Sequence, residues 1–191
     1  GVNLLVWVVA SEREEKNRIM IELETARQMQ LALMPESDPQ IKGYDISGCC
    51  IPARNVGGDL FDFVWFPEEK KKLCITVVDV SGKGMDAAFT AVYTSGAFIS
   101  EIQHEKEVKT IADNLNSAIY SRQDRNRFVC ALMVALDITN KKISYVNAGQ
   151  MRPLLFRKGD LSVLKNSGAR FPLGVVESPK YMSASTQLKS G

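Results

Sequence analysis

The stretch VGGDLFDF occupies residues 56–63, where the sequence pattern changes from helical to strand-like. Asp59 and Asp62 stand there among aromatic and aliphatic residues, and an ionised carboxylate is costly to bury unless it is paired or binds a cation. Residues 60–66 and 73–78 are rich in β-formers and flank the charged loop 67–72. The stretch therefore predicts the first strand of a β-hairpin whose carboxylates need a partner.

The hairpin brings Asp59 close to a second acidic residue, Asp79. A loop centred between Glu69 and Lys70 would pair Asp59 with Val80, one position from Asp79. Facing side chains on paired strands lie about 5 Å apart, so the two carboxylates are expected to converge at one end of the hairpin. They would repel each other unless a cation lay between them. Because all the ligands are oxygens, the sequence favours Mg²⁺ or Mn²⁺.

Hydrophobic periodicity around the hairpin indicates an α+β protein. The other expected elements are a strand over 44–51, helices over 85–100 and 108–120, and strands over 128–136, 142–147, 153–157 and 161–165. Runs of strands interrupted by two helices are typical of antiparallel sheets covered by helices rather than of a βαβ array.

The N-terminal part predicts a long helix over residues 11–34, which ends before Pro35. Four apolar residues and one glutamine follow a four-three spacing at Ile19, Leu23, Ala26, Gln30 and Leu33. The pattern fits a two-stranded coiled coil, a helix docked on a neighbour, or a helix packed on its own domain. The proline-containing linker 35–39 then separates a helical segment, 1–35, from a domain over 40–191.

The apolar run at residues 2–10 has about half of the ~20 residues that a membrane span requires. Three interpretations stay open: the end of an upstream membrane helix, the end of an upstream sensor domain, or the apolar start of a packed helix.

Composition excludes several classes of function. The chain has 24 basic and 22 acidic residues without a basic stripe, which argues against nucleic acid as a partner. Its single histidine, His104, argues against a Ser-His-Asp triad or a histidine-rich zinc site, and we expect it to be exposed near a helix end. The cysteines form no C-x-x-C pair and lie in apolar runs, so buried free thiols in a reducing cytosol are expected at Cys49, Cys50, Cys74 and Cys130.

Five motifs in the same order resemble the bacterial stage II sporulation protein E (SpoIIE) family. This family is a branch of the metal-dependent (PPM, type 2C-like) serine/threonine phosphatases and includes stress-response sigma-factor regulators. The motifs are ELETARQMQ with LMP at 22–30 and 33–35, GGDLFDF at 57–63, DVSGKG at 79–84, NAGQ at 147–150 and FPLG at 171–174.

The resemblance implies an αββα sandwich of two antiparallel sheets flanked by helices. It also implies hydrolysis of phosphoserine or phosphothreonine by water activated between two Mn²⁺ or Mg²⁺ ions. Asp59 and Asp79 match metal-ligand positions, with Asp79 as the bridge and the Val80 carbonyl as a further ligand. The implied setting is a cytoplasmic output domain that acts on a phosphorylated regulatory protein such as an anti-sigma-factor antagonist. We also expect an upstream sensor domain and a homodimer formed through the N-terminal helix.

Two departures from the family pattern stand out. Gln150 replaces the histidine of the family's Asn-Ala-Gly-His element. The sequence also stops before the family's later Asp-Gly strand and final aspartate, so we expect a C-terminally incomplete domain with two of four metal-binding aspartates. The alternative function is therefore a catalytically inactive, phosphatase-like signalling module. A second-messenger cyclase is disfavoured, because that reading needs an acidic residue where Leu60 stands.

Overall fold

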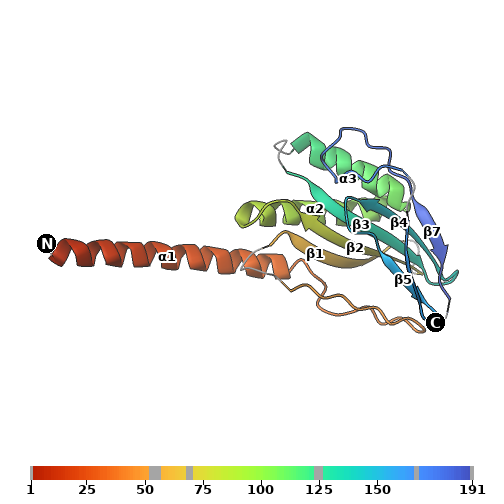
Figure 1. Ribbon diagram of the computed structural model, residues 1–191, viewed down its shortest axis with the longest axis horizontal. Coiled ribbons are helices and arrows are strands. Elements are labelled where there is room, and N and C mark those ends of the chain that lie inside the picture. The colour runs from red at the N-terminus through yellow and green to blue at the C-terminus, as the bar shows by residue number, and fades with distance from the viewer. Residues whose placement is uncertain (1, 52–56, 68–70, 123–126, 166–167, 190–191) are drawn as a thin grey trace.

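The computed structural model describes residues 2–51, 57–67, 71–122, 127–165 and 168–189. These residues form α1 (Val2–Leu31), β1 (Asp59–Trp65), β2 (Lys72–Val80), α2 (Met85–His104), α3 (Val108–Arg122), β3 (Val129–Asp137), β4 (Lys142–Ala148), β5 (Leu154–Arg157), β6 (Asp160–Val163) and β7 (Ala184–Gln187) (Figure 1). The hydrophobic periodicity predicts α2, α3 and the strands β1 to β6, although several ends differ by a few residues. It misses β7, a short polar strand.

One antiparallel sheet holds five strands in the order β1-β2-β3-β4-β7. The alternation along β2 shows which face of this sheet is buried. Thr76, Val78 and Val80 are buried on one face. Val77 and Asp79 lie on the opposite face and are exposed. Strand geometry alone therefore places Asp79 on the outer face of the sheet.

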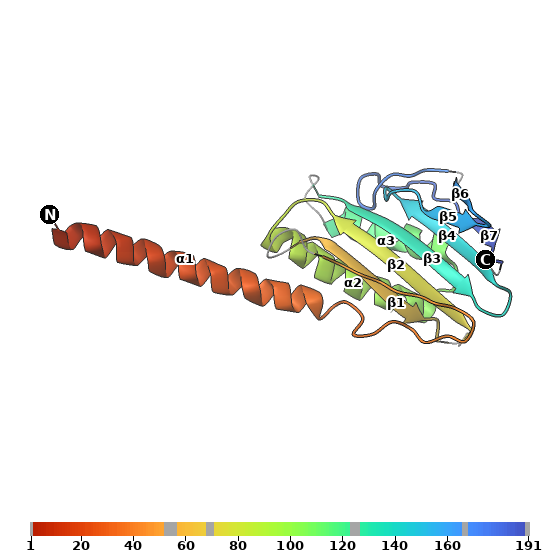
Figure 2. The same cartoon turned by 60° about the horizontal axis from the view of Figure 1, so that its bottom comes forward.

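Helices α2 and α3 cover the inner face of the sheet and lie behind it in Figure 2. Their apolar side chains form one core with those of the strands, which includes Ile102, Ile111, Leu115, Ile119, Met133 and Val146. Burial of such side chains contributes about 1.5–3 kcal/mol each and is the main source of stability. The expected α+β fold, with antiparallel strands covered by helices, is confirmed.

A second, two-stranded antiparallel sheet consists of β5 and β6. It lies on the β4–β7 side of the molecule (Figure 2). Its apolar side chains are largely solvent-exposed, with 69% exposure at Phe156 and 65% at Leu161. Within the described residues, the two sheets of the expected sandwich therefore have five and two strands, and α2 and α3 cover one face of the larger sheet.

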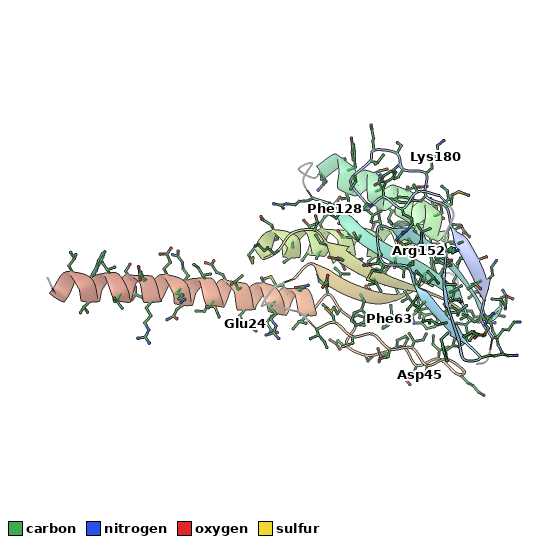
Figure 3. All side chains as sticks on the ribbon, viewed as in Figure 1. Glu24, Asp45, Phe63, Phe128, Arg152 and Lys180 are labelled. Carbon is green, nitrogen blue, oxygen red and sulfur yellow. The ribbon has the colours of Figure 1, made fainter. Side chains whose placement is uncertain are left out.

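Helix α1 starts at Val2, earlier than expected, because the apolar run at 2–10 continues the helix. Figure 3 shows its side chains radiating outward along most of its length. Its C-terminal turns pack on the domain: Ala26 and Gln30 are buried, and Ala26 packs against Ala88 of α2. Packing of α1 on the chain's own domain thus explains the C-terminal part of the predicted seam, at Ala26 and Gln30. No helix among the described residues is long and apolar enough to cross a membrane.

The expected strand over 44–51 is wrong. The segment makes only an isolated bridge between Ile41 and Tyr44 and otherwise packs as coil against β1. A Cβ on Gly48 would lie 2.2 Å from the Phe61 ring, and the Gly48 N–H donates to Asp38 Oδ1 at 3.0 Å. Close packing on an aromatic ring replaces strand pairing here.

Only part of the cysteine expectation holds. All four cysteines are free thiols, and Cys74 on β2 is fully buried. Cys130 on β3 is partly buried. The expectation is wrong for Cys49, which is exposed, and for Cys50, which is half-buried, because the coil that carries them lies at the protein surface. His104 is exposed at the end of α2, as expected.

Candidate metal centre

Strands β1 and β2 place Asp59 directly opposite Asp79. The predicted register, with Asp59 opposite Val80, is wrong by one residue. All pairs of the ladder, down to Trp65–Leu73, centre on position 69, whereas the sequence analysis placed the centre between positions 69 and 70. The observed register brings the two carboxylates closer than predicted, because directly facing side chains lie about 5 Å apart.

Both aspartates open onto a surface cleft of about 480 Å³ on the outer face of the sheet. We call it the acidic cleft. It is lined by Asp59 and Asp79, by the coil at 47–51, by Phe61, Phe63 and other apolar residues of β1 and β2, and by Gln150. The predicted convergence of the two carboxylates on a solvent-accessible cleft is therefore present in the structure.

The electrostatics of the acidic cleft favour a cation. Partial burial, the negative charge of Asp79 and a hydrogen bond between the two carboxyl groups raise the pKa of Asp59. Burial raises the pKa of the Cys50 and Cys130 thiols, and the negative charges of Asp59 and Asp79, respectively, raise it further. Negative charge thus accumulates at Asp59 and Asp79, and a cation bound between them would neutralise it.

Val80 lies at the same end of the hairpin, with its side chain buried in the core. Its N–H donates to the Gly58 carbonyl at 3.2 Å. A Cβ on Gly58 would lie 2.5 Å from the Val80 carbonyl oxygen, so only glycine permits this approach of the two strands. Gly58 therefore sets the backbone position next to both Asp59 and the predicted carbonyl ligand.

Gln30 of α1 holds the backbone on both sides of Gly58. Its Oε1 accepts from the Gly57 N–H at 3.0 Å, and its Nε2 donates to the Asp59 carbonyl at 2.8 Å. Gln30 is 3% exposed, so these bonds lie away from water. The sequence analysis placed Gln30 in a helical seam and in the motif at 22–30 but gave it no role, and its polar character at an otherwise apolar seam position was the missed signal.

The other motifs meet around the same end of the sheet. Ser81, two residues after Asp79, donates its N–H to the Phe128 carbonyl at 2.9 Å and accepts the Phe128 N–H on Oγ at 2.8 Å. Gly149, with φ of 85°, packs so closely on the FPLG segment that a Cβ would lie 2.7 Å from Pro172 Cγ. These contacts fix the turns that surround the acidic cleft.

The donor set fits part of a site for a hard divalent cation. Asp59, Asp79 and the Val80 carbonyl offer oxygen ligands, which Mg²⁺ and Mn²⁺ prefer. Among the described residues, no group of three or more His, Cys, Asp or Glu side chains converges on one point. Water would therefore complete the coordination of an ion held by these residues alone.

The sequence profile of stage II sporulation protein E (SpoIIE) matches residues 69–191. The chain belongs to the SpoIIE family. The matched range includes Asp79, NAGQ and FPLG, and Asp59 lies ten residues before it.

Two phosphatases of Bacillus subtilis are similar to this SpoIIE-family chain. Phosphoserine phosphatase RsbU is 23% identical over 176 residues, which cover 92% of this chain and 52% of RsbU. Phosphoserine phosphatase RsbP is 24% identical over 172 residues, which cover 86% of this chain and 41% of RsbP. The chain thus spans about half the length of the curated relatives it matches.

Solved structures share the fold of this SpoIIE-family chain. The SiaA PP2C domain of Pseudomonas aeruginosa superposes with a TM-score of 0.67 at 18% identity, covering 92% of this chain and 69% of that one. The PP2C domain of Bacillus subtilis SpoIIE, with a fragment of its regulatory domain, gives a TM-score of 0.61 at 18% identity, covering 71% and 39%. The predicted PP2C-like fold is therefore confirmed.

Replacing Asp59 by Asn is expected to stabilise the metal-free protein. Like charges on facing strand positions are destabilising, so we expect the free energy of unfolding at pH 7 to rise by about 0.5–1 kcal/mol in EDTA. Because the folded-state pKa of Asp59 is raised, the repulsion develops as pH rises through that pKa. The gain should therefore vanish at pH values well below it. Urea unfolding at both pH values measures this, and a less stable variant at pH 7 would contradict the repulsion.

Proposed function

We propose that this chain is the catalytic part of a metal-dependent protein serine/threonine phosphatase. The observation that carries the proposal is the Asp59–Asp79 pair, which faces an open cleft in a domain of the SpoIIE family. The names of RsbU and RsbP, both phosphoserine phosphatases, support the same reaction.

Asp59 and Asp79 would hold the divalent cations, with Asp79 between the two ions and the Val80 carbonyl as a further ligand. Two such cations, when bound, make hydroxide available near neutral pH and neutralise phosphoryl oxygens. In the reaction, a water oxygen bonds to phosphorus while the bond from phosphorus to the serine or threonine oxygen breaks. The leaving oxygen takes the proton that the attacking water loses, and inorganic phosphate is released.

The position of His104 supports a reaction without a histidine base. His104 ends α2 near Lys106, whose carbonyl accepts from Lys72 Nζ at 2.8 Å at the start of β2. Asp79 lies at the other end of β2, seven residues or about 23 Å along the strand. The single imidazole of the chain therefore lies far from the carboxylates.

The substrate that we propose is a phosphorylated regulatory protein of the anti-sigma-factor-antagonist type, in the cytoplasm. We further propose that α1 transmits the state of an upstream sensor, since Gln30 bonds directly to the backbone at Asp59. The exposed N-terminal part of α1 would pair with that of a second copy to form a homodimer. Mg²⁺ and Mn²⁺ are both proposed cofactors, and a structure of the similar protein RsbX is a complex with magnesium.

Phosphate release from a phosphoserine-containing protein tests this proposal. A whole protein that carries this domain should release phosphate when Mn²⁺ or Mg²⁺ is present and stop when EDTA is added. Renewed excess of the metal should restore the rate, which separates metal removal from denaturation. Release that continues in EDTA would contradict the proposal.

The alternative is a phosphatase-like module without activity. Among the described residues, only Asp59 and Asp79 offer carboxylates at the proposed centre, and two carboxylates neutralise only part of the charge of two divalent ions. The present chain is accordingly expected to bind Mn²⁺ weakly. A whole protein that binds its phosphorylated partner but releases no phosphate in saturating Mn²⁺ would establish this alternative.

A further inference from the structure

Gln150 lines the acidic cleft from the turn that follows β4. In the sheet, Asp79 pairs with Cys130, and the next residue of β3, Ala131, bridges to Gly149. Adjacent strands lie about 4.8 Å apart, so the backbone at Gln150 is about 10 Å from that at Asp79. The carboxylate pair and Gln150 therefore lie on two sides of one cleft.

The backbone of this turn is held by side chains from two directions. Asn147, which is fully buried, donates from Nδ2 to the Met151 carbonyl at 3.0 Å. Arg170 donates from Nη2 to the Gln150 carbonyl at 2.7 Å. The label of Arg152, which follows this turn, shows where the turn lies in Figure 3. Gln150 thus projects from a fixed backbone rather than from a free loop.

The side-chain amide of Gln150 uses its oxygen in a hydrogen bond within the turn, whereas its nitrogen is available to a ligand. Its Oε1 accepts from the Met151 N–H at 2.9 Å. Within the described part of the chain, its Nε2 has no hydrogen-bond partner. A primary amide nitrogen carries two N–H donors, so Gln150 offers donors but not its carbonyl oxygen to a ligand.

A phosphate ester needs donors in this cleft. Its oxygens are acceptors and carry negative charge, whereas the carboxylates on the opposite side offer only further acceptors. Hydrogen bonds to charged groups are stronger than those between neutral groups. The Arg170 guanidinium, bonded to the Gln150 carbonyl, adds positive charge on the same side of the cleft.

We propose that Gln150 binds the phosphoryl group of the substrate through Nε2. Asp59 and Asp79 hold the cations on one side of that group, and Gln150 donates to a phosphoryl oxygen from the other. This assignment rests on the proposed phosphatase function and gives Gln150 a role in affinity for phosphate rather than for the metal.

Titration of inorganic phosphate into the chain, with MnCl₂ in excess, tests the assignment. Gln150→Ala should raise the Kd for phosphate about tenfold, as loss of one hydrogen bond to a charged oxygen predicts. Its Kd for Mn²⁺ should stay within about twofold of the wild-type value. Gln150→His should recover much of the phosphate affinity, because imidazole also supplies an N–H donor. Gln103→Ala, an exposed glutamine on α2, is the matched control and should change neither value.

Two results would overturn the assignment while leaving the proposed function intact. One is unchanged phosphate affinity in Gln150→Ala. The other is a parallel loss of Mn²⁺ affinity, which would indicate a purely structural role. If instead the wild-type chain binds Mn²⁺ but no phosphate, and the whole protein hydrolyses no phosphoserine or p-nitrophenyl phosphate, the proposed function fails and the assignment falls with it.

Discussion

Asp79→Asn is expected to lower Mn²⁺-dependent phosphatase activity of a protein carrying this domain by about a hundred- to a thousandfold. Loss of one preorganised electrostatic contact at a reacting centre typically has an effect of this size. Asp79 faces Asp59 and is the proposed ligand shared by both cations, so its neutral amide would weaken both ion sites at once. Initial rates with p-nitrophenyl phosphate, measured across a Mn²⁺ titration, give the change in activity and in metal requirement.

A matched variant separates this effect from a general loss of charge. Asp160→Asn removes an exposed carboxylate on β6 and should leave the rate and the Mn²⁺ dependence unchanged. Wild-type turnover by Asp79→Asn at saturating Mn²⁺ would show that the cations are held elsewhere.

Gly58→Ala is expected to reduce the free energy of unfolding by about 1–3 kcal/mol, the usual range for overpacking. The added Cβ would lie 2.5 Å from the Val80 carbonyl oxygen and 2.8 Å from Val80 Cβ. Neither atom is at the end of a flexible side chain, so the strands must separate where Asp59 meets Asp79. The affinity for Mn²⁺ should fall together with stability, because the carboxylates move apart.

Gly96→Ala is the matched control for Gly58→Ala. Gly96 lies inside α2, and a Cβ there would meet nothing within 4 Å. Alanine should raise the free energy of unfolding by about 0.5–1 kcal/mol, because glycine is unfavourable inside helices. Urea unfolding followed by circular dichroism measures both variants. Equal stability of Gly58→Ala and wild type would show that the close approach at Val80 is not needed.

Most of the fold could be predicted from the hydrophobic pattern of the sequence. The periods of α2 and α3 and the alternation along β1 to β4 predicted elements whose apolar faces meet in one core. Asp79 could be placed near Asp59 because both flank the same short hairpin. These predictions succeed because local periodicity and the tertiary packing favour the same arrangement.

Most failures arise where contacts distant in sequence decide the structure, and one arises from the local geometry of a turn. The segment 44–51 resembles a strand, but Gly48 packs on Phe61 and the segment adds no strand to the sheet. The hairpin register depends on turn geometry, which a symmetric loop does not fix. Gln30 bonds to residues 27 and 29 positions away, and Gln150 meets Asp59 and Asp79 in the cleft only because the sheet brings β4 near β2.

The most direct test of the Asp59–Asp79 metal centre is an anomalous difference map, recorded above the manganese absorption edge, from crystals of this chain soaked in MnCl₂. We expect a peak between Asp59 and Asp79, about 2–2.5 Å from carboxylate oxygens of both residues. Soaked crystals of Asp79→Asn should lose this peak. A manganese peak at another site, with none at the Asp59–Asp79 pair, would contradict the assignment of the metal centre.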